Sequence, residues 1–436
     1  MRQIVNTVSA FQFYHVMRYS ALVLIAVVFT KTSLTRVEIG SYETFLLIAG
    51  AVSFFWLNGL IKAMLPMAGK SSYSEDESQA VFSSFVVISL LGILAALLFY
   101  LTRNFFPPLL LNGAPAPFPA LLMAYLVFGI PANLSEYIYL IRKNNRGLLY
   151  YAVVSSLVQV TFTALPALLG WGIEAAVKGM TLSYFLRYLW LWILLATNYR
   201  LRISLPFLQR YIRTAIPLIG AIFLSGSAEY VDGFIVTTHF DEETLAIFRY
   251  GAREFPLTIL MANALSASLL PAMGNGSKLP ENLRSIFENT RRLMHILFPL
   301  SAVLMILAHP LFPILFNAGF SESATIFNIY LLLVASRLLF PQTILIGMNR
   351  TRPILTASLM ELMVNVLLSL ILVRFFGIGG IAAATVIAFV LEKIFLTSMV
   401  RKHLGIHSSD YIPWRLLLGY SAGLSGLFIL VEFIIY

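Results

Sequence analysis

Residues 225–274 read SGSAEYVDGFIVTTHFDEETLAIFRYGAREFPLTILMANALSASLLPAMG, which predicts two membrane helices joined by the acidic turn HFDEE. The first helix carries Glu229 and Asp232, three residues apart, and the second carries Arg249 and Arg253, four apart, so each pair shares a helix face. An ionised side chain inside a membrane costs about 2.5–3.5 kcal/mol on insertion scales and rarely faces lipid. We therefore expect these side chains to form one wall of a polar cavity between two helical bundles.

The composition is that of a membrane protein. Of the 436 residues, 59% are hydrophobic and only 11% are charged, whereas charged residues make up about a quarter of a soluble domain. The sequence contains no cysteine, which excludes disulfides and thiolate metal ligands. It also contains no phosphate-binding glycine loop, no metal-ligand spacing and no recognisable nucleophile motif. We therefore expect no cofactor and no metal, and nothing in the sequence points to an enzyme.

Thirteen apolar stretches are long enough to cross a bilayer, which takes about 17–25 residues. With the N-terminus in the cytoplasm, most of the 30 Lys and Arg residues fall at cytoplasmic ends and loops, as the positive-inside rule requires. The net charge of +10 is then explained by topology and by contact with anionic membrane lipids, so no nucleic acid partner is expected. The expected spans are residues 9–30, 41–66, 79–102, 117–141, 148–170, 175–198, 209–238, 242–272, 293–316, 323–348, 353–374, 378–400 and 412–435.

An internal repeat relates the two halves of the chain at an offset of 208 residues. Tyr42 falls on Tyr250, Arg142 falls on Arg350, and the segment GIEAA falls on the segment GIAAA. Six spans separate the copies, so both enter the membrane in the same direction. This predicts an all-α polytopic protein with about 12–13 transmembrane helices in two pseudo-symmetric six-helix lobes around a central cavity. The expected parts are an N-lobe at 1–198, a cytoplasmic linker at 199–208, a C-lobe at 209–400, and a loop with an additional C-terminal span at 401–436.

Three arginines within the spans are the candidates for binding an anionic head group. Arg18 has no acidic residue in its own span or in the core of the next, and Arg249 and Arg253 share one face of the eighth span. Two guanidinium groups on one face suit bidentate recognition of phosphate oxygens. The alternative is that these arginines only neutralise carboxylates on adjacent helices.

Two other charged pairs within the spans have simpler explanations. Arg337 and Glu361 lie on sequential spans, and both a simple ion pair and a functional role stay open for them. Glu392 and Lys393 lie near the cytoplasmic end of their span. For these two residues we favour side chains that extend to the membrane surface.

Several segments resemble the multidrug/oligosaccharidyl-lipid/polysaccharide (MOP) flippase superfamily, and most closely its polysaccharide transporter branch, the Wzx-type oligosaccharide flippases. The segments are VEIGSY at 37–42, AEYVD at 228–232, FRYGAR at 248–253, and the turn and helix at 377–393. The resemblance covers nearly the whole chain by span count, loop size and repeat. The thirteenth span departs from the usual twelve, and the two extra spans of the peptidoglycan-precursor flippases do not both fit.

The resemblance implies a V-shaped pair of lobes, as in the MATE transporters, that open alternately to the two membrane faces. It implies a multi-pass protein of the bacterial inner membrane that moves undecaprenyl-diphosphate-linked oligosaccharide outward for O-antigen or related lipopolysaccharide synthesis. In related flippases, cavity arginines on the first and eighth spans are thought to meet the diphosphate, and Arg18, Arg249 and Arg253 match them by span and depth. The transport unit is expected to be a monomer, with a polysaccharide polymerase or ligase complex as a possible partner.

Polar and aromatic side chains at the same depth are candidates to line the cavity and to couple an ion. A histidine in the position of His15 is more often packed or hydrogen-bonded than a ligand. A proton or sodium ion is the expected coupling ion, if there is one. The candidate cavity-lining residues are Tyr14, His15, Tyr230 and Tyr250, and the candidate ion-coupling residues are Asp232, Glu229 and Glu136.

Three other functions compete with a flippase. A cation-coupled multidrug exporter of the same superfamily should have a cavity dominated by acidic residues, and the cations within the spans argue against it. A membrane-embedded glycosyltransferase or polymerase usually carries a long loop with a catalytic carboxylate, and the loops here are short. A non-transporting scaffold in a glycan-assembly complex stays open.

Overall fold

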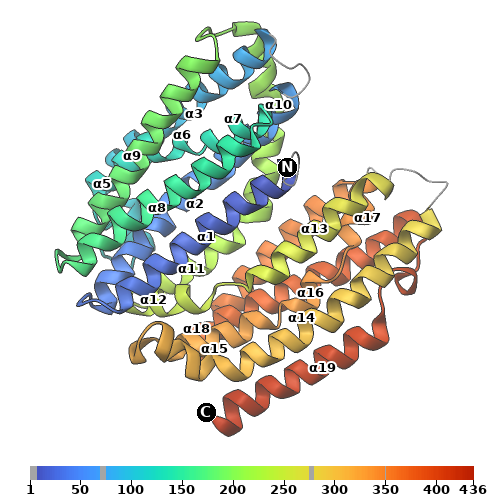
Figure 1. Cartoon of the computed structure of the whole chain (residues 1–436). Helices are drawn as coiled ribbons and strands as arrows, with labels where there is room; N and C mark the ends of the chain where they lie inside the picture. The colour runs from blue at the N-terminus through green and yellow to red at the C-terminus, as the bar shows by residue number, and fades with distance from the viewer. Residues whose placement is uncertain (1–6, 69–74, 274–278, 349) are drawn as a thin grey trace. The chain divides into compact units, whose positions relative to one another are not determined.

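The structure is a computed structural model that describes residues 7–68, 75–273, 279–348 and 350–436 (Figure 1). All regular elements among these residues are helices, which confirms the expected all-α class. The chain divides into two compact units. Unit 1 comprises residues 1–226 and 237–246, and unit 2 comprises residues 227–236 and 247–436.

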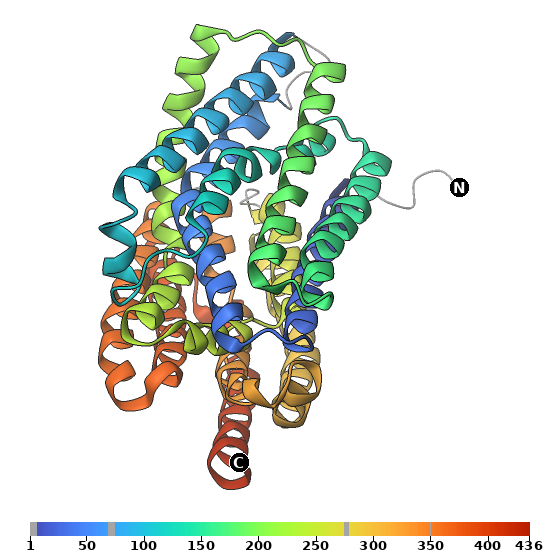
Figure 2. The ribbon, with the colours of Figure 1, turned by 90° about the vertical axis from the view of Figure 1, so that its left-hand side faces the viewer.

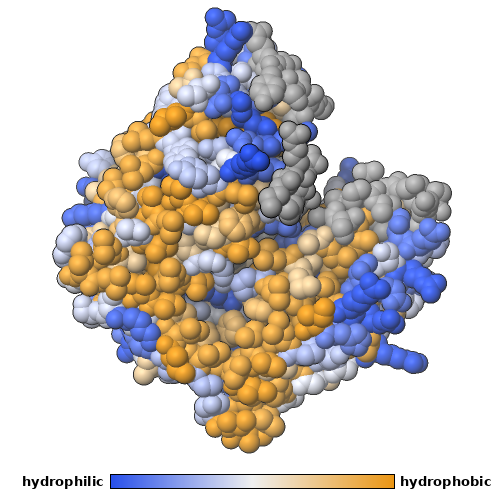
Figure 3. All heavy atoms as spheres, viewed as in Figure 1, coloured by the Kyte–Doolittle hydropathy of each residue, from blue (hydrophilic) through white to orange (hydrophobic). Residues whose placement is uncertain are grey.

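Within the described residues, ten helices are long and apolar enough to cross a membrane, or up to eleven if a bent pair counts as one span. Exposed leucines cover their outer faces, as on α3, where Leu90 is 60% and Leu101 is 67% exposed. Figure 3 shows the resulting apolar areas in orange. The ten helices are α1 (Thr7–Thr30), α2 (Arg36–Ala68), α3 (Glu75–Thr102), the composite Pro119–Ile141, α8 (Asn145–Leu168), α9 (Gly172–Asn198), α10 (Leu205–Gly226), α14 (Leu279–Leu315), α18 (Arg352–Leu404) and α19 (Trp414–Leu430).

The described residues form ten long helices and not the thirteen expected spans, because some expected spans are broken into shorter helices and two are merged into one. The eleventh and twelfth expected spans form one element, α18, which is kinked at Gly377 (φ 56°, ψ −139°), a conformation that favours glycine. The expected tenth span is a pair of helices bent by 43°. The remaining breaks divide the seventh and eighth expected spans. These form α10 with α11 (Ala228–His239), and α12 (Glu242–Gly251) with α13 (Pro256–Met273).

Helix α10 packs inside unit 1, against α2. Gly59 of α2 permits this approach, because a Cβ atom there would lie 2.4 Å from the Ile219 side chain and 2.8 Å from its Cα atom. The boundary of unit 1 therefore differs from the expected lobe boundary, because residues 209–226 lie in unit 1 and not in the C-lobe, where they are expected. The apolar pattern identified the helix but carried no information about its neighbours.

The acidic turn before α12 packs against the N-terminal end of α2. Ser41 donates a hydrogen bond to Glu242, and Arg36 forms an ion pair with Glu243 at 2.6 Å. Asp241 caps α12 by accepting hydrogen bonds from the hydroxyl and backbone N–H of Thr244 at 2.7 and 2.8 Å. These hydrogen bonds lower the pKa of Asp241 and keep the cap ionised.

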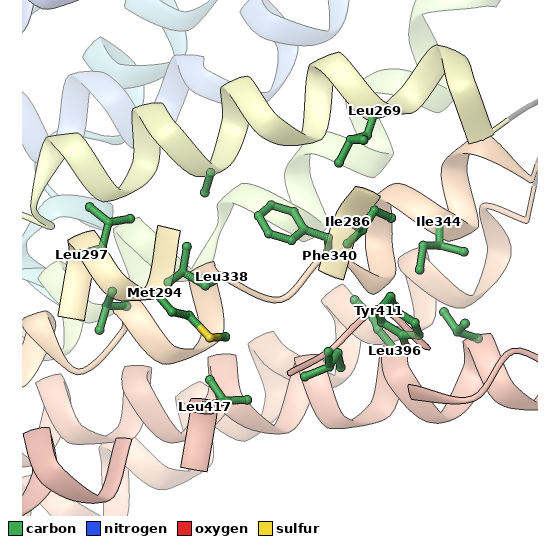
Figure 4. Packing of buried hydrophobic residues seen from close by; sticks show 14 of the residues in the cluster. Leu269, Ile286, Met294, Leu297, Leu338, Phe340, Ile344, Leu396, Tyr411 and Leu417 are labelled. Carbon is green, nitrogen blue, oxygen red and sulfur yellow. The ribbon is translucent and has the colours of Figure 1, made fainter. Parts of the chain in front are cut away.

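The core of unit 2 is built from α13, α14, α17 (Pro341–Gly347), α18 and α19. Figure 4 shows this cluster, in which Met294 and Leu297 of α14 face the same interior as Leu269, Leu396 and Leu417. Burial of each such side chain contributes about 1.5–3 kcal/mol. The large apolar side chains thus join five helices into one folded unit.

The additional C-terminal helix is part of this core. Helix α19 packs on α14 at the edge of unit 2 (Figure 1), and Figure 2 shows the C-terminal end of this helix in red. Near its end, Glu432 accepts hydrogen bonds from Asn328 and Thr325 at 2.6 and 2.7 Å and pairs with His309 at 2.9 Å. A polar anchor at an otherwise apolar end fixes the register of α19 against α14 and α15 (Glu322–Leu331).

Gly40→Ala tests how tightly the acidic turn packs. A Cβ atom at Gly40 would lie 1.9 Å from the backbone oxygen of Glu242, so the two segments must separate, which costs about 1–3 kcal/mol. We expect a lower melting temperature for the purified protein in detergent. Gly419→Ala is the control, because nothing lies within 4 Å of its Cβ position. Equal melting temperatures for the two variants would contradict the close contact.

Candidate functional site

Arg18 lies in a polar cluster inside unit 1. Its Nη1 atom donates a hydrogen bond to Oδ1 of Asn133 at 3.0 Å and lies 3.6 Å from Oε1 of Glu136. Glu136 is on α7 (Ser135–Ile141), so the fourth span supplies the carboxylate that the first span lacks. Arg18 is therefore ion-paired across helices rather than isolated.

Arg187 of α9 completes this cluster. Its Nη2 atom lies 3.8 Å from Oε2 of Glu136 and donates to the Tyr14 hydroxyl at 3.0 Å, and its Nε atom donates to the Tyr151 hydroxyl at 3.0 Å. Two arginines thus share the single carboxylate of Glu136. At neutral pH the cluster has a net positive charge.

A local irregularity in the fourth span positions Asn133 and Glu136. The π-helix Tyr125–Gly129 precedes Pro131, and a π-turn displaces the residues that follow it relative to a regular helix. The side-chain amide of Asn133 donates to the carbonyls of Gly129 and Ile130 at 3.0 and 3.1 Å. Its carbonyl oxygen is thereby fixed to accept from Arg18.

The two arginines differ in their access to a ligand. The side chain of Arg18 is 30% exposed, whereas that of Arg187 is 4% exposed. Arg187 stabilises the cluster from inside, and Arg18 presents the charge that Glu136 does not fully neutralise. A partly exposed guanidinium held by a fixed amide is suited to an anionic oxygen.

Of the expected cavity-lining residues in unit 1, Tyr14 is buried and His15 is exposed. Tyr14 is 1% exposed, and its hydroxyl accepts from both Arg187 and Arg18. It lies inside the cluster rather than on an open surface, because the two arginines take up its polar atom. The His15 ring stands edge-on to Phe11, with ring centres 4.5 Å apart.

Arg249 and Arg253 belong to unit 2 and do not share one continuous helix face, contrary to the expectation. Helix α12 ends at Gly251, so Arg253 lies in the non-helical segment before Pro256. The proline explains the break, because it disfavours helical backbone at the preceding residue and starts α13. Both side chains are half-buried, and the Arg253 guanidinium lies 5.1 Å from the centre of the Tyr250 ring.

The two tyrosines of unit 2 that are expected to line the cavity differ from each other in burial. Tyr250 is 1% exposed and stacks on Phe320 at 4.8 Å between ring centres, so it packs inside the unit. Tyr230 is half-buried on α11. That Arg18 acts together with Arg249 and Arg253 stays a prediction.

Asp232 of α11 is held in a buried set of oxygen and amide groups. Its carboxylate accepts from the Thr385 hydroxyl at 2.5 Å and from the Tyr330 hydroxyl at 3.2 Å, and Asn365 donates to Thr385 at 3.0 Å. Glu229, on the same helix, has a side chain outside the described residues. The ion-coupling role expected for Asp232, Glu229 and Glu136 stays a prediction.

The remaining charges of unit 2 pair differently from the expectations. Arg337 pairs with Glu254, whose Oε2 atom accepts from Nε at 2.9 Å, and not with Glu361. Lys393 pairs with the adjacent Glu392 at 2.9 Å, with both side chains at most 8% exposed, so they do not extend to the membrane surface. These partners are distant in sequence or adjacent on a helix. Spacing rules therefore did not identify Glu254 as the partner of Arg337.

Comparisons with known proteins agree with this architecture. Residues 33–325 match the family described as polysaccharide biosynthesis protein. The structure is similar to that of the lipid II flippase MurJ in an inward closed conformation (TM-score 0.72, 17% identity, 97% of this chain and 93% of that chain). It is also similar to an inward-facing multidrug resistance MATE family transporter of the MOP superfamily (TM-score 0.65, 14% identity, 94% and 98%). A search of curated protein sequences gives no match.

Glu136→Ala tests the arginine cluster. The variant leaves two charges in unit 1 without a carboxylate, and removing one partner of a buried ion pair costs about 3–5 kcal/mol. We expect a marked fall in the melting temperature of the purified protein. Glu174→Ala removes the exposed carboxylate that pairs with Lys178 at 2.8 Å and should change the stability by about 0–1 kcal/mol. Similar melting temperatures for both variants would show that Glu136 carries no structural charge.

Proposed function

The chain belongs to the polysaccharide biosynthesis protein family, and from this premise we propose that it is a flippase for lipid-linked oligosaccharide. The proposed substrate is undecaprenyl-diphosphate-linked oligosaccharide, moved from the cytoplasmic to the outer leaflet of the bacterial inner membrane for O-antigen or related polysaccharide synthesis. The fold is that of the MOP superfamily, as expected from the resemblance. It is a multi-pass membrane protein.

One observation carries the proposal. Arg18 is partly exposed, and it shares a single carboxylate, that of Glu136, with Arg187. The excess positive charge at membrane depth needs an anion, because an uncompensated charge there is costly. A diphosphate provides several anionic oxygens that a guanidinium binds in a bidentate manner. Arg249 and Arg253 would add charge from unit 2.

The mechanism follows from the chemistry of the substrate. The diphosphate binds the arginines and the sugars stay in an aqueous cavity, while the polyprenyl tail stays in lipid and avoids the cost of hydration. The two units then expose the head group to the outside by alternating access. A proton or sodium ion at Asp232 is the proposed coupling ion. Glu136 suits this role less, because it is held between two arginines.

The positive-inside rule supports an N-terminus in the cytoplasm. The proposed transport unit is the monomer. A polysaccharide polymerase or ligase complex would take up the product.

A multidrug exporter is the second candidate, since solved MATE transporters share the fold. Its cationic substrates would be repelled by the Arg18 cluster and attracted by a carboxylate such as that of Asp232 in unit 2. The choice of substrate therefore separates the two candidates. In reconstituted vesicles, faster transport of a cationic dye than of a diphosphate-linked glycolipid would favour the exporter.

Arg18→Gln tests the flippase. Loss of a hydrogen bond to a charged group costs about 1.5–3 kcal/mol, which corresponds to about a tenfold to hundredfold slower translocation of a diphosphate-linked glycolipid in vesicles. In cells, the variant should lose surface glycan and accumulate the lipid-linked precursor at an unchanged protein level. Arg415→Gln, at an exposed arginine of α19, is the control. Normal glycan display by the Arg18 variant would remove the arginine from the proposed mechanism.

A further inference from the structure

Two interrupted helices of unit 2 meet at an ion pair. Glu254 lies in the non-helical segment 252–255, and Arg337 ends α16 (Val334–Arg337), directly before the 43° bend that precedes α17. Their side chains are joined by the ion pair described above. Irregular backbone at membrane depth is tolerated only where protein or a cavity covers it, and discontinuous helices commonly frame ion sites in transporters.

The charged side chains around the Glu254–Arg337 contact form two ion pairs. Arg337 is neutralised by Glu254, and Lys393 is neutralised by Glu392. A fifth group, Glu361 on the first half of α18, is only 7% exposed. Among the described residues, none forms a hydrogen bond or an ion pair with its carboxyl group. Glu361 therefore belongs to neither ion pair.

The groups that face Glu361 come from several elements. Glu392 and Lys393 on the second half of α18, Arg337 on α16 and Asp232 on α11 are all close enough to interact with it electrostatically. Tyr330 on α15 bonds to Asp232. Two cations thus face three carboxylates including Glu361 itself, and both cations already have carboxylate partners. The surroundings do not compensate a further negative charge.

A buried carboxylate without compensation must bind a cation or be neutral. A metal ion would be repelled by Arg337 and Lys393 and would require several oxygen ligands, whereas a proton requires no further ligand. We propose that Glu361 is a proton-binding site of unit 2 and carries a proton in the packing described here. Glu361 is not a member of the hydrogen-bonded Asp232 set, and the proposal does not depend on which substrate the protein moves.

Infrared spectroscopy of the full-length protein in lipid nanodiscs tests the proposal directly. At neutral pH we expect the C=O stretching band of a protonated carboxyl group, and Glu361→Gln should remove the part of its intensity that Glu361 contributes. Glu174→Gln, at an exposed and paired carboxylate, is the control and should keep the band. Replacing sodium by potassium should leave the band unchanged. A band whose intensity is the same in Glu361→Gln as in the unmodified protein, or a Glu361-dependent band that appears only without sodium, would overturn the proposal.

Thermal unfolding gives a second, independent measurement. Gln resembles a neutral carboxyl group in size, so Glu361→Gln should melt at or above the temperature of the unmodified protein. Glu254→Gln should melt lower, because it leaves Arg337 without its carboxylate. If Glu361→Gln instead fails to fold or melts as low as Glu254→Gln, then Glu361 is ionised and the proposal is wrong.

Discussion

The cost of placing charge where water is absent is the constraint on which the rest of this structure depends. An ionised side chain on a membrane helix is stable only where a partner group or a water-filled cavity compensates its charge. In unit 1 that partner is Glu136, which Arg18 and Arg187 approach from two other helices. The carboxylate therefore links three spans, and its removal would affect all of them. The same arrangement leaves positive charge in excess at Arg18, the more exposed of the two arginines.

The two units satisfy this constraint with different clusters of charged side chains. The Arg18 cluster of unit 1 has two arginines for one carboxylate, whereas in unit 2 Arg337 and Lys393 each have a carboxylate partner and Glu361 has neither of these cations as its ion-pair partner. A repeat can preserve helix order while the buried charges of its copies diverge. The internal repeat thus describes the scaffold and not the chemistry.

Irregular backbone positions charged side chains in both units. The π-helix before Pro131 positions Asn133 and Glu136, and the break before Pro256 brings Glu254 to Arg337. A continuous helix could present side chains only at its own fixed spacing. Interruptions remove this restriction, and the surrounding helices cover the exposed backbone. Proline in the sequence marks both places.

The sequence by itself determined the class of the protein, because hydrophobicity and helix length are properties of local segments. The apolar runs predicted the helices, and the resemblance identified the superfamily. Local spacing did not reveal the partners of Arg18 and Arg337, the burial of Tyr14 and Tyr250, or the packing of α10 within unit 1. These depend on side chains from spans far apart in sequence, which only the tertiary structure brings together. The arginine at position 18 was visible in the sequence, but the carboxylate that positions it was not.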